Sequence, residues 1–418
     1  PYLSIFGPLV FVRPYFYRRG VGGVAPVDAH LSLPAHACSD LVRETAEELG
    51  VEGPYHKGLG VLRRLLGLNL STRLLQEQVA EDAPAVEAFY VQQTPPAEED
   101  APILVLQADG KGVPILRPSA QPAPVRLGKG QKHGGKKEAT LTAIYTIAPA
   151  ARTPEAVVES LFSAATVPPA AGATARSGPQ HKRLWATLAG KEAALAEAAA
   201  QVTRRDGPQI THRVALTDGS QALQERVQRQ FPHFTLVLDL IHATEYLWKV
   251  ANALLGETHP GRTVWVKTRT LLLLQSQARQ VVDEFRCLAQ EPARPKFQRK
   301  VLTGVAAYLA RNAPFMDYAA YLAHGWPIAT GVIEGACRHL VKDRCEQSGM
   351  RWTIAGAEAL LHLRCVQENG DWDAYHAFRR RQRHQRLYAL PYPENVAMTP
   401  VDLRALEPDA AVQLSLAA

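Results

Sequence analysis

Three acidic residues stand where their side chains could do chemistry rather than aid solubility. Asp109 ends the apolar run 103–108, and Asp218 follows a short apolar strand over 214–216. The third, Glu334, lies in the first turn of a helix expected over 330–344. Carboxylate oxygens with no Cys or His cluster nearby suit Mg²⁺ or Mn²⁺ better than Zn²⁺.

If these three side chains converge, a cation must lie between them. Two carboxylates 4 Å apart repel each other by about 4 kcal/mol at an effective dielectric constant near 20. Two divalent ions about 4 Å apart can activate a water or a 3′-hydroxyl and stabilise the leaving oxygen of a phosphoryl transfer. Each acid also has a structural interpretation: Asp109 and Asp218 precede glycines and could form turns, and Glu334 could interact with the helix dipole.

The elements around these acids predict a mixed α/β sheet. Strands are expected over 103–109, 113–116, 139–147, 214–216 and 235–238, with helices over 154–165, 181–204 and 220–230. The interval between the last two strands fits a parallel crossover through a helix. Three strands, then helix, strand, helix and strand, is the order of a ribonuclease H-like fold, in which the acids can meet at one edge of the sheet.

Other segments frame this sheet. We expect an irregular segment over 1–33, a helical domain over 34–92, the first part of the ribonuclease H-like catalytic domain over 93–240, an all-helical insertion over 241–329, further helices of the catalytic domain over 330–388, and a tail over 389–418. In the N-terminal domain Ser71 can cap a helix after a Gly-containing turn, as in a helix-turn-helix. Thr72, Arg73 and Gln76 would then begin a recognition helix, although any small helical bundle offers such a turn.

Composition indicates a globular protein with a polyanionic partner. The 418 residues are 46% hydrophobic and 21% charged, with a formal net charge of +7. The positive charge is clustered between Arg117 and Lys137 and again between Arg379 and Arg386, which favours nucleic acid, although solvated surfaces are the plain alternative.

The cysteines and the apolar runs predict where the protein resides. Five cysteines without a Cys-x-x-Cys pair argue against a disulfide framework and against a zinc site, so a reducing cytoplasm is expected. No apolar run approaches the roughly 20 residues of a membrane span, and no signal peptide is evident. The chain begins at Pro1 without Met, so its true start could lie further upstream.

Several motifs together resemble a known family. They are Ala-Asp109-Gly-Lys-Gly-Val-Pro, Leu-Thr-Asp218-Gly-Ser-Gln-Ala-Leu, Leu-Asp239-Leu-Ile-His242-Ala-Thr-Glu-Tyr-Leu-Trp, Gly-Val-Ile-Glu334-Gly-Ala-Cys-Arg-His-Leu-Val-Lys-Asp-Arg and Met350-Arg-Trp352. Over roughly residues 100 to 370 the chain resembles the Kra-type group of bacterial insertion-sequence transposases, relatives of the eukaryotic Mutator elements. Relatives usually carry a cysteine-bearing segment near the N-terminus, where this chain has Tyr15-Phe-Tyr17-Arg-Arg-Gly.

The resemblance implies a DDE-type transposase in the bacterial cytoplasm, associated with the nucleoid. Asp109, Asp218 and Glu334 would be the catalytic metal ligands for two Mg²⁺ or Mn²⁺ ions, with Asp239 and His242 in a supporting role. The partner would be double-stranded DNA, both the inverted repeats that end the element and the target, held by a homo-oligomer. The missing N-terminal cysteines leave room for a domesticated or inactive DNA-binding derivative, and a ribonuclease H-like nuclease is a further alternative.

Candidate DNA contacts follow from the basic residues near the acids and in the two clusters. They are Lys111, Arg126, Lys129, Lys132, Lys136, Lys137, Arg338, Lys342, Arg344, Arg351, Arg379, Arg380 and Arg381. Trp352 joins them because arginines flank it and an indole can stack on an unpaired base, although tryptophans more often pack in a core.

Overall fold

A computed structural model describes residues 2–18, 22–34, 36, 38–93, 100–116, 135–163 and 177–388. Contacts within the chain divide it into two compact units, which we describe separately. Residues 91–369 form the central unit, and residues 1–90 together with 370–418 form the terminal unit.

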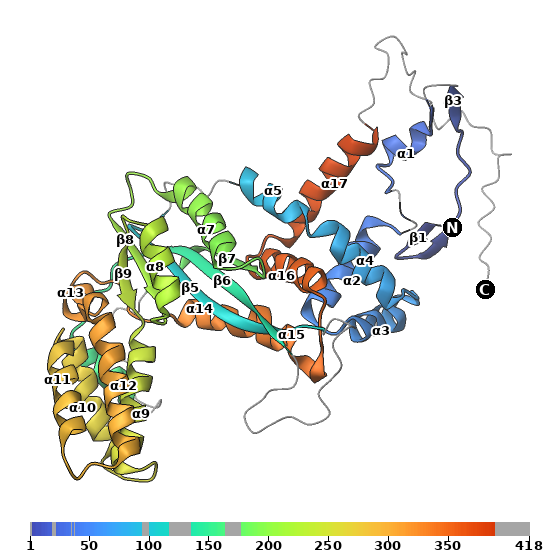
Figure 1. Ribbon diagram of the computed structural model, residues 1–418. Coiled ribbons are helices and arrows are strands. Elements are labelled where there is room, and N and C mark those ends of the chain that lie inside the picture. Colours follow the sequence, from blue (N-terminus) through green and yellow to red (C-terminus); the bar gives the residue numbers. More distant parts are fainter. Residues whose placement is uncertain are drawn as a thin grey trace. The chain divides into compact units, whose positions relative to one another are not determined.

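A five-stranded sheet organises the central unit (Figure 1). Its strands, in spatial order, are β7 (Gln180–Thr187), β6 (Lys136–Ile147), β5 (Ile103–Pro114), β8 (His212–Thr217) and β9 (Thr235–Leu238). Strand β6 runs antiparallel to β5 and β7, whereas β5, β8 and β9 are parallel. The prediction of a ribonuclease H-like mixed sheet is confirmed.

Strand β5 lies in the middle of the sheet because its residues are apolar on both faces. Leu104 and Leu106 pack towards helices α7 (Lys191–Arg205) and α8 (Gln221–Gln230). Ile103 and Val105 pack on the opposite face, in the core shared with α6 (Pro154–Phe162) and the helical insertion. A strand covered by helices on both faces is a nearly continuous apolar run, and this pattern in the sequence predicted the start of β5.

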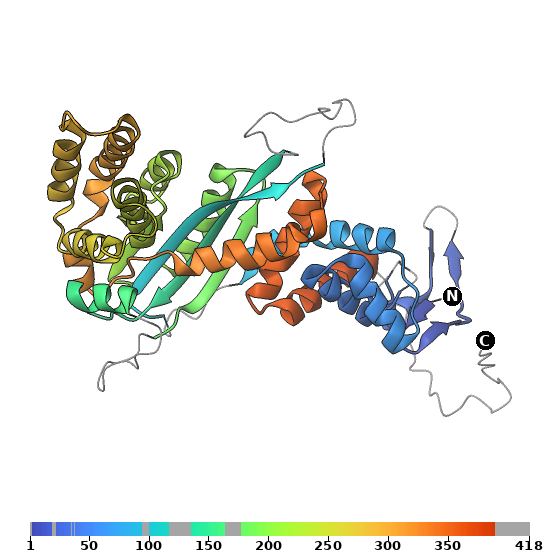
Figure 2. The same cartoon turned by 90° about the horizontal axis from the view of Figure 1, so that it is seen from below.

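The insertion between β9 and the last part of the sheet domain is entirely helical, as predicted. It comprises α9 (Leu240–Leu255), α10 (Arg262–Leu274), α11 (Ala278–Gln290), α12 (Lys296–Asn312), η2 (Ala313–Phe315) and α13 (Tyr318–Ala323). The chain then forms α14 (Gly331–Ala336), the π-helical segment η3 (Cys337–Lys342), α15 (Asp343–Cys345), η4 (Gln347–Gly349) and α16 (Ile354–Glu368). In both ribbon views the run from α14 to α15 lies beside β5 (Figures 1 and 2).

Two predictions about this region were wrong, one about the strands over 103–116 and one about the helix over 181–204. The strands expected over 103–109 and 113–116 are one strand, because β5 continues through Asp109 and Gly110 and pairs with β6 along its whole length. Asp109 therefore does not form a turn. The helix expected over 181–204 begins instead with β7, whose Leu184 and Trp185 are buried and which pairs with β6, so that only the Ala-rich remainder becomes α7. Pairing with a neighbouring strand outweighed local helix propensity here.

The terminal unit combines small hairpins with helices. Its elements are β1 (Tyr2–Ser4), β2 (Gly7–Leu9), β3 (Phe16–Arg18), β4 (Gly22–Val24), α1 (Pro26–His30), α2 (Asp40–Glu52), α3 (Tyr55–Leu66), α4 (Thr72–Asp82), α5 (Ala85–Gln92) and α17 (Trp372–Tyr388). The Ser71 hydroxyl accepts a hydrogen bond from the Leu74 backbone N–H at 3.1 Å, so the predicted cap of α4 is present.

The last helix differs from the expectation that 330–388 would stay with the sheet. Tyr375 and Phe378 of α17 pack against Phe89 of α5 with ring centroids 5.4 and 5.6 Å apart, so α17 belongs to the terminal unit. Within the described residues, no helix is both long enough and apolar enough to cross a membrane.

Candidate functional site

Three acids lie at the same level on or directly after three neighbouring parallel strands. Gln107 of β5 is paired with Leu216 of β8, and Asp109 and Asp218 each lie two residues further on. Asp239 directly follows β9, and its backbone N–H donates to the Thr217 carbonyl at 2.9 Å. Carboxyl ends of parallel strands are where α/β proteins place their ligand sites.

The turn after β8 is held by the helical insertion. Gly219 has φ +86°, and the Asp218 side chain accepts a hydrogen bond from the Ser220 N–H at 2.9 Å, which matches the turn interpretation of this acid. Helix α12 reaches the same turn: the Tyr308 hydroxyl donates to the Asp218 carbonyl at 3.0 Å, and Arg311 donates to the Gly219 carbonyl at 2.8 Å. Asp218 is thus fixed by its own turn and by a helix ninety residues away.

Glu334 is positioned by a buried amide on the central strand. Gln107 is fully buried, and its Oε1 accepts from the Ile333 backbone N–H at 3.0 Å. Its Nε2 donates to the Tyr145 hydroxyl at 2.9 Å and to the Ala329 carbonyl at 3.3 Å. Since Gln107 lies two residues before Asp109, this side chain ties the start of α14 to the strand that carries the first acid.

Asp239 holds the turn before Glu334 through a second set of hydrogen bonds. Its Oδ1 accepts from the Thr330 N–H at 3.0 Å, while its carboxylate also caps α9 by accepting from the Ile241 and His242 N–H groups. The Thr330 hydroxyl in turn donates to Glu334 Oε1 at 3.0 Å. Glu334 therefore projects from a turn that is held on both sides.

His242 lies between Asp239 and Glu334. Its Nδ1 is 2.6 Å from Asp239 Oδ2 and 3.9 Å from Glu334 Oε1. The hydrogen bond to Asp239 raises the pKa of His242 to about 9, so this ring is protonated at neutral pH. Asp239, His242 and Glu334 each offer a ligand atom within 4.8 Å of the others, and no such group among the described residues includes Asp109 or Asp218.

Cys337 links Asp109 to the Glu334 helix. It lies where α14 becomes π-helical, and its thiol donates to Asp109 Oδ2 at 3.4 Å. Burial, followed by the charge of Asp109, raises the pKa of this thiol, which therefore stays protonated as a donor. Single turns of π-helix are frequent at functional sites.

Four residues of this site were not identified from the sequence: Gln107, Cys337, Tyr308 and Arg311. For Gln107 a signal existed, because a lone amide inside an apolar strand has to find buried partners. The other three act through contacts with distant segments, which leave no local pattern.

Several predicted DNA contacts are accessible. Lys137, Arg338, Lys342 and Arg351 are exposed, and Lys111 is half-buried two residues beyond Asp109. Lys136 is exposed as well but pairs with Glu346 at 2.5 Å. Arg126, Lys129 and Lys132 lie outside the described residues.

Arg344 has to be removed from the predicted surface contacts. Only 1% of it is exposed, and its guanidinium lies over the Trp352 ring, 4.8 Å from the centroid. Trp352 is itself half-buried: its indole N–H donates to the Cys345 carbonyl at 3.1 Å, and its backbone bridges to the strand end at Ile115. Both residues pack the end of α15 against the extension of β5.

Two of the three predicted DNA contacts on α17 form ion pairs with acids of the same unit. Arg379 forms an ion pair with Asp82 at 2.7 Å and Arg380 pairs with Glu44, whereas Arg381 is exposed. The positive cluster read from the sequence is therefore mostly a seam between α17 and the acids of α2 and α4. At the start of α4, Thr72, Arg73 and Gln76 are exposed, as a recognition helix requires.

Comparison with known proteins adds little to this geometry. No family model matches the chain, and no curated protein matches it. Among solved structures, the chain is similar to a chain of the Drosophila P element transposase strand transfer complex, with 8% sequence identity and a TM-score of 0.28, covering 84% of this chain and 81% of that chain. A similarity this weak carries no argument about activity.

Proposed function

We propose that this chain is a DNA transposase that binds the terminal inverted repeats of its element and catalyses metal-dependent strand cleavage and strand transfer. The observation that carries the proposal is the common level of Asp109 and Asp218, each two residues beyond the last paired residues of β5 and β8, with the Glu334 turn held at the same edge. A clamp of this kind holds a catalytic acid in place, whereas a solvated surface acid needs none.

The side chains present suit hard divalent cations. Among the described residues, no ion pair joins a Lys or Arg to Asp109, Asp218 or Glu334, and the one cationic side chain beside these acids is His242, 3.9 Å from Glu334. All three are only partly buried, which leaves their oxygens accessible. We assign Asp109, Asp218 and Glu334 as ligands for two Mg²⁺ or Mn²⁺ ions, which would supply an activated nucleophile and a stabilised leaving oxygen.

The protein's own groups have distinct tasks in this scheme. Gln107 and Asp239 hold the Glu334 turn, while Tyr308 and Arg311 hold the Asp218 turn. His242, protonated and bonded to Asp239, places a positive charge beside Glu334, where it can orient that carboxylate or contact a phosphate oxygen.

The DNA would lie along the exposed cations near the site. Lys137, Arg338, Lys342 and Arg351 present their charge in the central unit, and the start of α4 presents Thr72, Arg73 and Gln76 in the terminal unit. Phosphate contacts fix the register of DNA on a protein, and base contacts select its sequence. Because two ends must be joined, we expect the active form to be a homo-oligomer.

The decisive experiment incubates the full chain with labelled element ends and Mg²⁺. Asp218→Asn should abolish cleavage and strand transfer while keeping end binding, because only a metal ligand is altered. Glu257→Gln, at an exposed acid in a loop of the insertion, is the matched control and should cleave normally. Cleavage that survives Asp218→Asn would refute the assignment.

The same assay separates the other functions. A transposase-derived DNA-binding protein without catalysis would bind the ends specifically but make no metal-dependent cut. A ribonuclease H-like nuclease would cut DNA yet never join a 3′-hydroxyl end to target DNA.

A further inference from the structure

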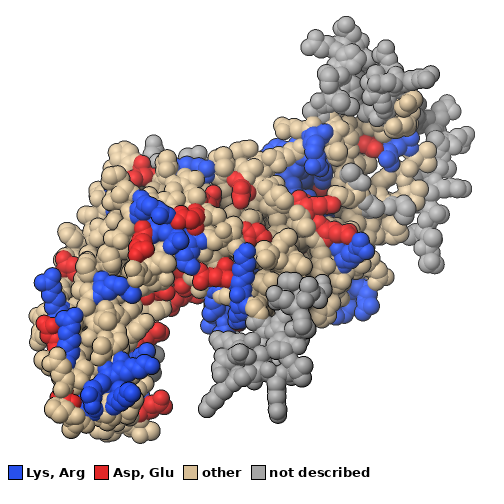
Figure 3. All heavy atoms as spheres, in the orientation of Figure 1, with Lys and Arg blue, Asp and Glu red and all other residues tan. Residues whose placement is uncertain are grey.

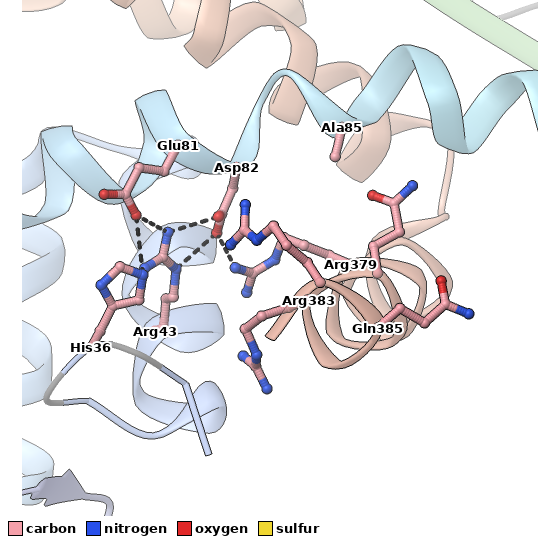
Figure 4. A pocket seen from close by; sticks show the side chains of 10 residues that line it. His36, Arg43, Glu81, Asp82, Ala85, Arg379, Arg383 and Gln385 are labelled. Carbon is pink, nitrogen blue, oxygen red and sulfur yellow. Dashed lines mark hydrogen bonds and ion pairs between the residues drawn. The ribbon is translucent and has the colours of Figure 1, made fainter. Parts of the chain in front are cut away.

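A cavity of about 670 Å³ opens in the terminal unit between α2, α4 and α17. Four arginines contribute to its wall: Arg43 from α2, and Arg379, Arg383 and Arg386 from α17. Figure 4 shows Arg379 and Arg383 extending from α17 to the side where Arg43 and Asp82 lie. The acids of the wall are Glu81 and Asp82, so arginines outnumber acids by two in the lining.

Both acids are already engaged. Asp82 receives two hydrogen bonds from Arg43, at 2.9 and 2.7 Å, and pairs with Arg379 at 2.7 Å (Figure 4). Glu81 accepts from Arg43 at 3.0 Å and lies 3.3 Å from His36. Two further acids of α2 lie against the same arginines: Asp40 accepts from Arg383 at 2.9 Å, and Glu47 lies 3.2 Å from Arg43. These contacts leave some guanidinium donors of the cluster unpaired.

Those remaining donors are buried without partners. Arg43 Nη1, Arg379 Nε and Nη2, and Arg383 Nε are buried and make no hydrogen bond to any described residue. The side chains themselves are only 3%, 11% and 8% exposed. Buried donors in folded proteins are almost always hydrogen-bonded, so a group of them around one cavity indicates a missing acceptor.

The missing acceptor has to be anionic and oxygen-rich. Guanidinium groups present planar forks of N–H donors that match the oxygens of phosphate, and a phosphate group can accept from several arginines at once. Arginines outnumber acids in the lining, which favours an anion over a cation. We propose that this cavity is a binding site for a phosphate group, held by Arg43, Arg379 and Arg383, with Arg386 at the rim.

The phosphate could belong to the DNA backbone or to a free phosphorylated small molecule. Helix α4 contributes Glu81 and Asp82 at its end, and exposes Thr72 and Arg73 at its start. A backbone phosphate in the cavity would therefore fix α4 on the duplex. The site does not depend on the catalytic acids, which lie in the central unit, so either proposal can fail without the other.

The test measures anion binding to the full chain by calorimetry at constant ionic strength, with inorganic phosphate and pyrophosphate as probes and chloride as the reference. We expect saturable binding that Arg386→Gln weakens roughly tenfold, the loss for one charged hydrogen bond. Arg386 is exposed and has no intramolecular ion pair among the described residues, so the variant should fold. Arg64→Gln removes the same charge from an exposed position on α3 and should leave binding unchanged.

A second arm identifies the source of the phosphate. If the site holds the DNA backbone, Arg386→Gln also weakens duplex binding, and pyrophosphate competes with the duplex. If it holds a free phosphorylated molecule, the probes bind while duplex affinity is the same in both proteins. The proposal is overturned if neither the probes nor the duplex distinguish Arg386→Gln from Arg64→Gln.

Discussion

The side chain of Gln107 accepts a hydrogen bond from the backbone N–H of Ile333 at 3.0 Å, although 226 residues separate them in the chain. Gln107 is on β5, the strand that carries Asp109, and Ile333 immediately precedes Glu334. This contact helps to set the distance between two proposed metal ligands, and two further hydrogen bonds, to Tyr145 and Ala329, hold the amide of Gln107 in place.

Replacing Gln107 by Leu should therefore damage activity more than stability. The change leaves the buried Ile333 N–H without an acceptor, which costs about 1–3 kcal/mol of unfolding free energy. The displaced Glu334 should lower the cleavage rate by about 100-fold, since small misplacements of catalytic groups have effects of that size. Unfolding by urea and single-turnover cleavage would be measured side by side.

Gln107→Glu serves as the comparison, because the carboxylate keeps the acceptor but loses the donor to Tyr145 and Ala329. It should retain more activity than Gln107→Leu. Equal cleavage by wild type and Gln107→Leu would mean that the Glu334 turn is held without this residue.

The turn after β8, which contains Asp218 and Gly219, predicts that a side chain at Gly219 would clash. A Cβ atom at Gly219 would lie 2.5 Å from the Tyr308 hydroxyl, and φ at this glycine is +86°. Gly219→Ala should thus destabilise the protein by more than about 1 kcal/mol, through strain and through displacement of α12. Thermal unfolding in the presence of EDTA reports the stability, and Mn²⁺ binding reports the site.

Tyr308→Phe separates the two contributions. Alone it should cost only about 0.5–1.5 kcal/mol, the loss of one hydrogen bond to the Asp218 carbonyl. In the double variant the missing hydroxyl relieves part of the clash, so the two costs should sum to more than the measured total. Strict additivity would contradict the contact.

The position of the acids in this architecture could be predicted because its signals are local. Apolar runs that lead into an acid can be recognised in the sequence before both Asp109 and Asp218, and a crossover of helix length follows Asp218. Strand β7 could not be predicted from the sequence, because Leu184 and Trp185 form a strand only through pairing with β6. Its neighbours in sequence include an Ala-rich helix, and that composition dominated the prediction.

The arginines of α17 show a different limit. On a helix, charges three and four residues apart share one face, and nothing in that spacing tells whether the face meets solvent or acids. The acids that pair with Arg379 and Arg380 are Asp82 and Glu44, about 300 residues earlier in the chain. Burial of this face, and the cavity beside it, could only be seen in three dimensions.

The acids behind that cavity predict a dependence of stability on pH. Glu47 is fully buried, and this burial, with the charge of Asp82, raises its pKa well above 4.5. The fold therefore keeps a proton that the unfolded chain releases near pH 4.5. Glu47 contributes its full stability below that pH and loses it as the pH rises towards the higher pKa of the folded protein.

Glu47→Gln should remove this loss, because the amide matches the protonated acid in shape and cannot ionise. The stability gained over wild type should be near zero at pH 4 and grow towards pH 8. Hydrogen exchange of the α2 and α17 amides measures the unfolding free energy of the terminal unit separately from that of the central unit. A gain that shrinks with rising pH would show that Glu47 is ionised in the fold.

The exposed cations of the central unit predict steep salt dependence of DNA binding. Each phosphate neutralised releases counterions, so affinity should fall about 10³-fold or more between 50 and 200 mM salt if six or more contacts form. Lys137 is exposed, with no intramolecular ion pair among the described residues, so Lys137→Ala should reduce the slope of log K against log salt by about one. Arg344→Met, at a buried arginine, should leave the slope unchanged in whatever fraction stays folded. Fluorescence anisotropy with an end-bearing duplex gives both slopes, and a larger change for Arg344→Met than for Lys137→Ala would mean that the DNA follows a different path.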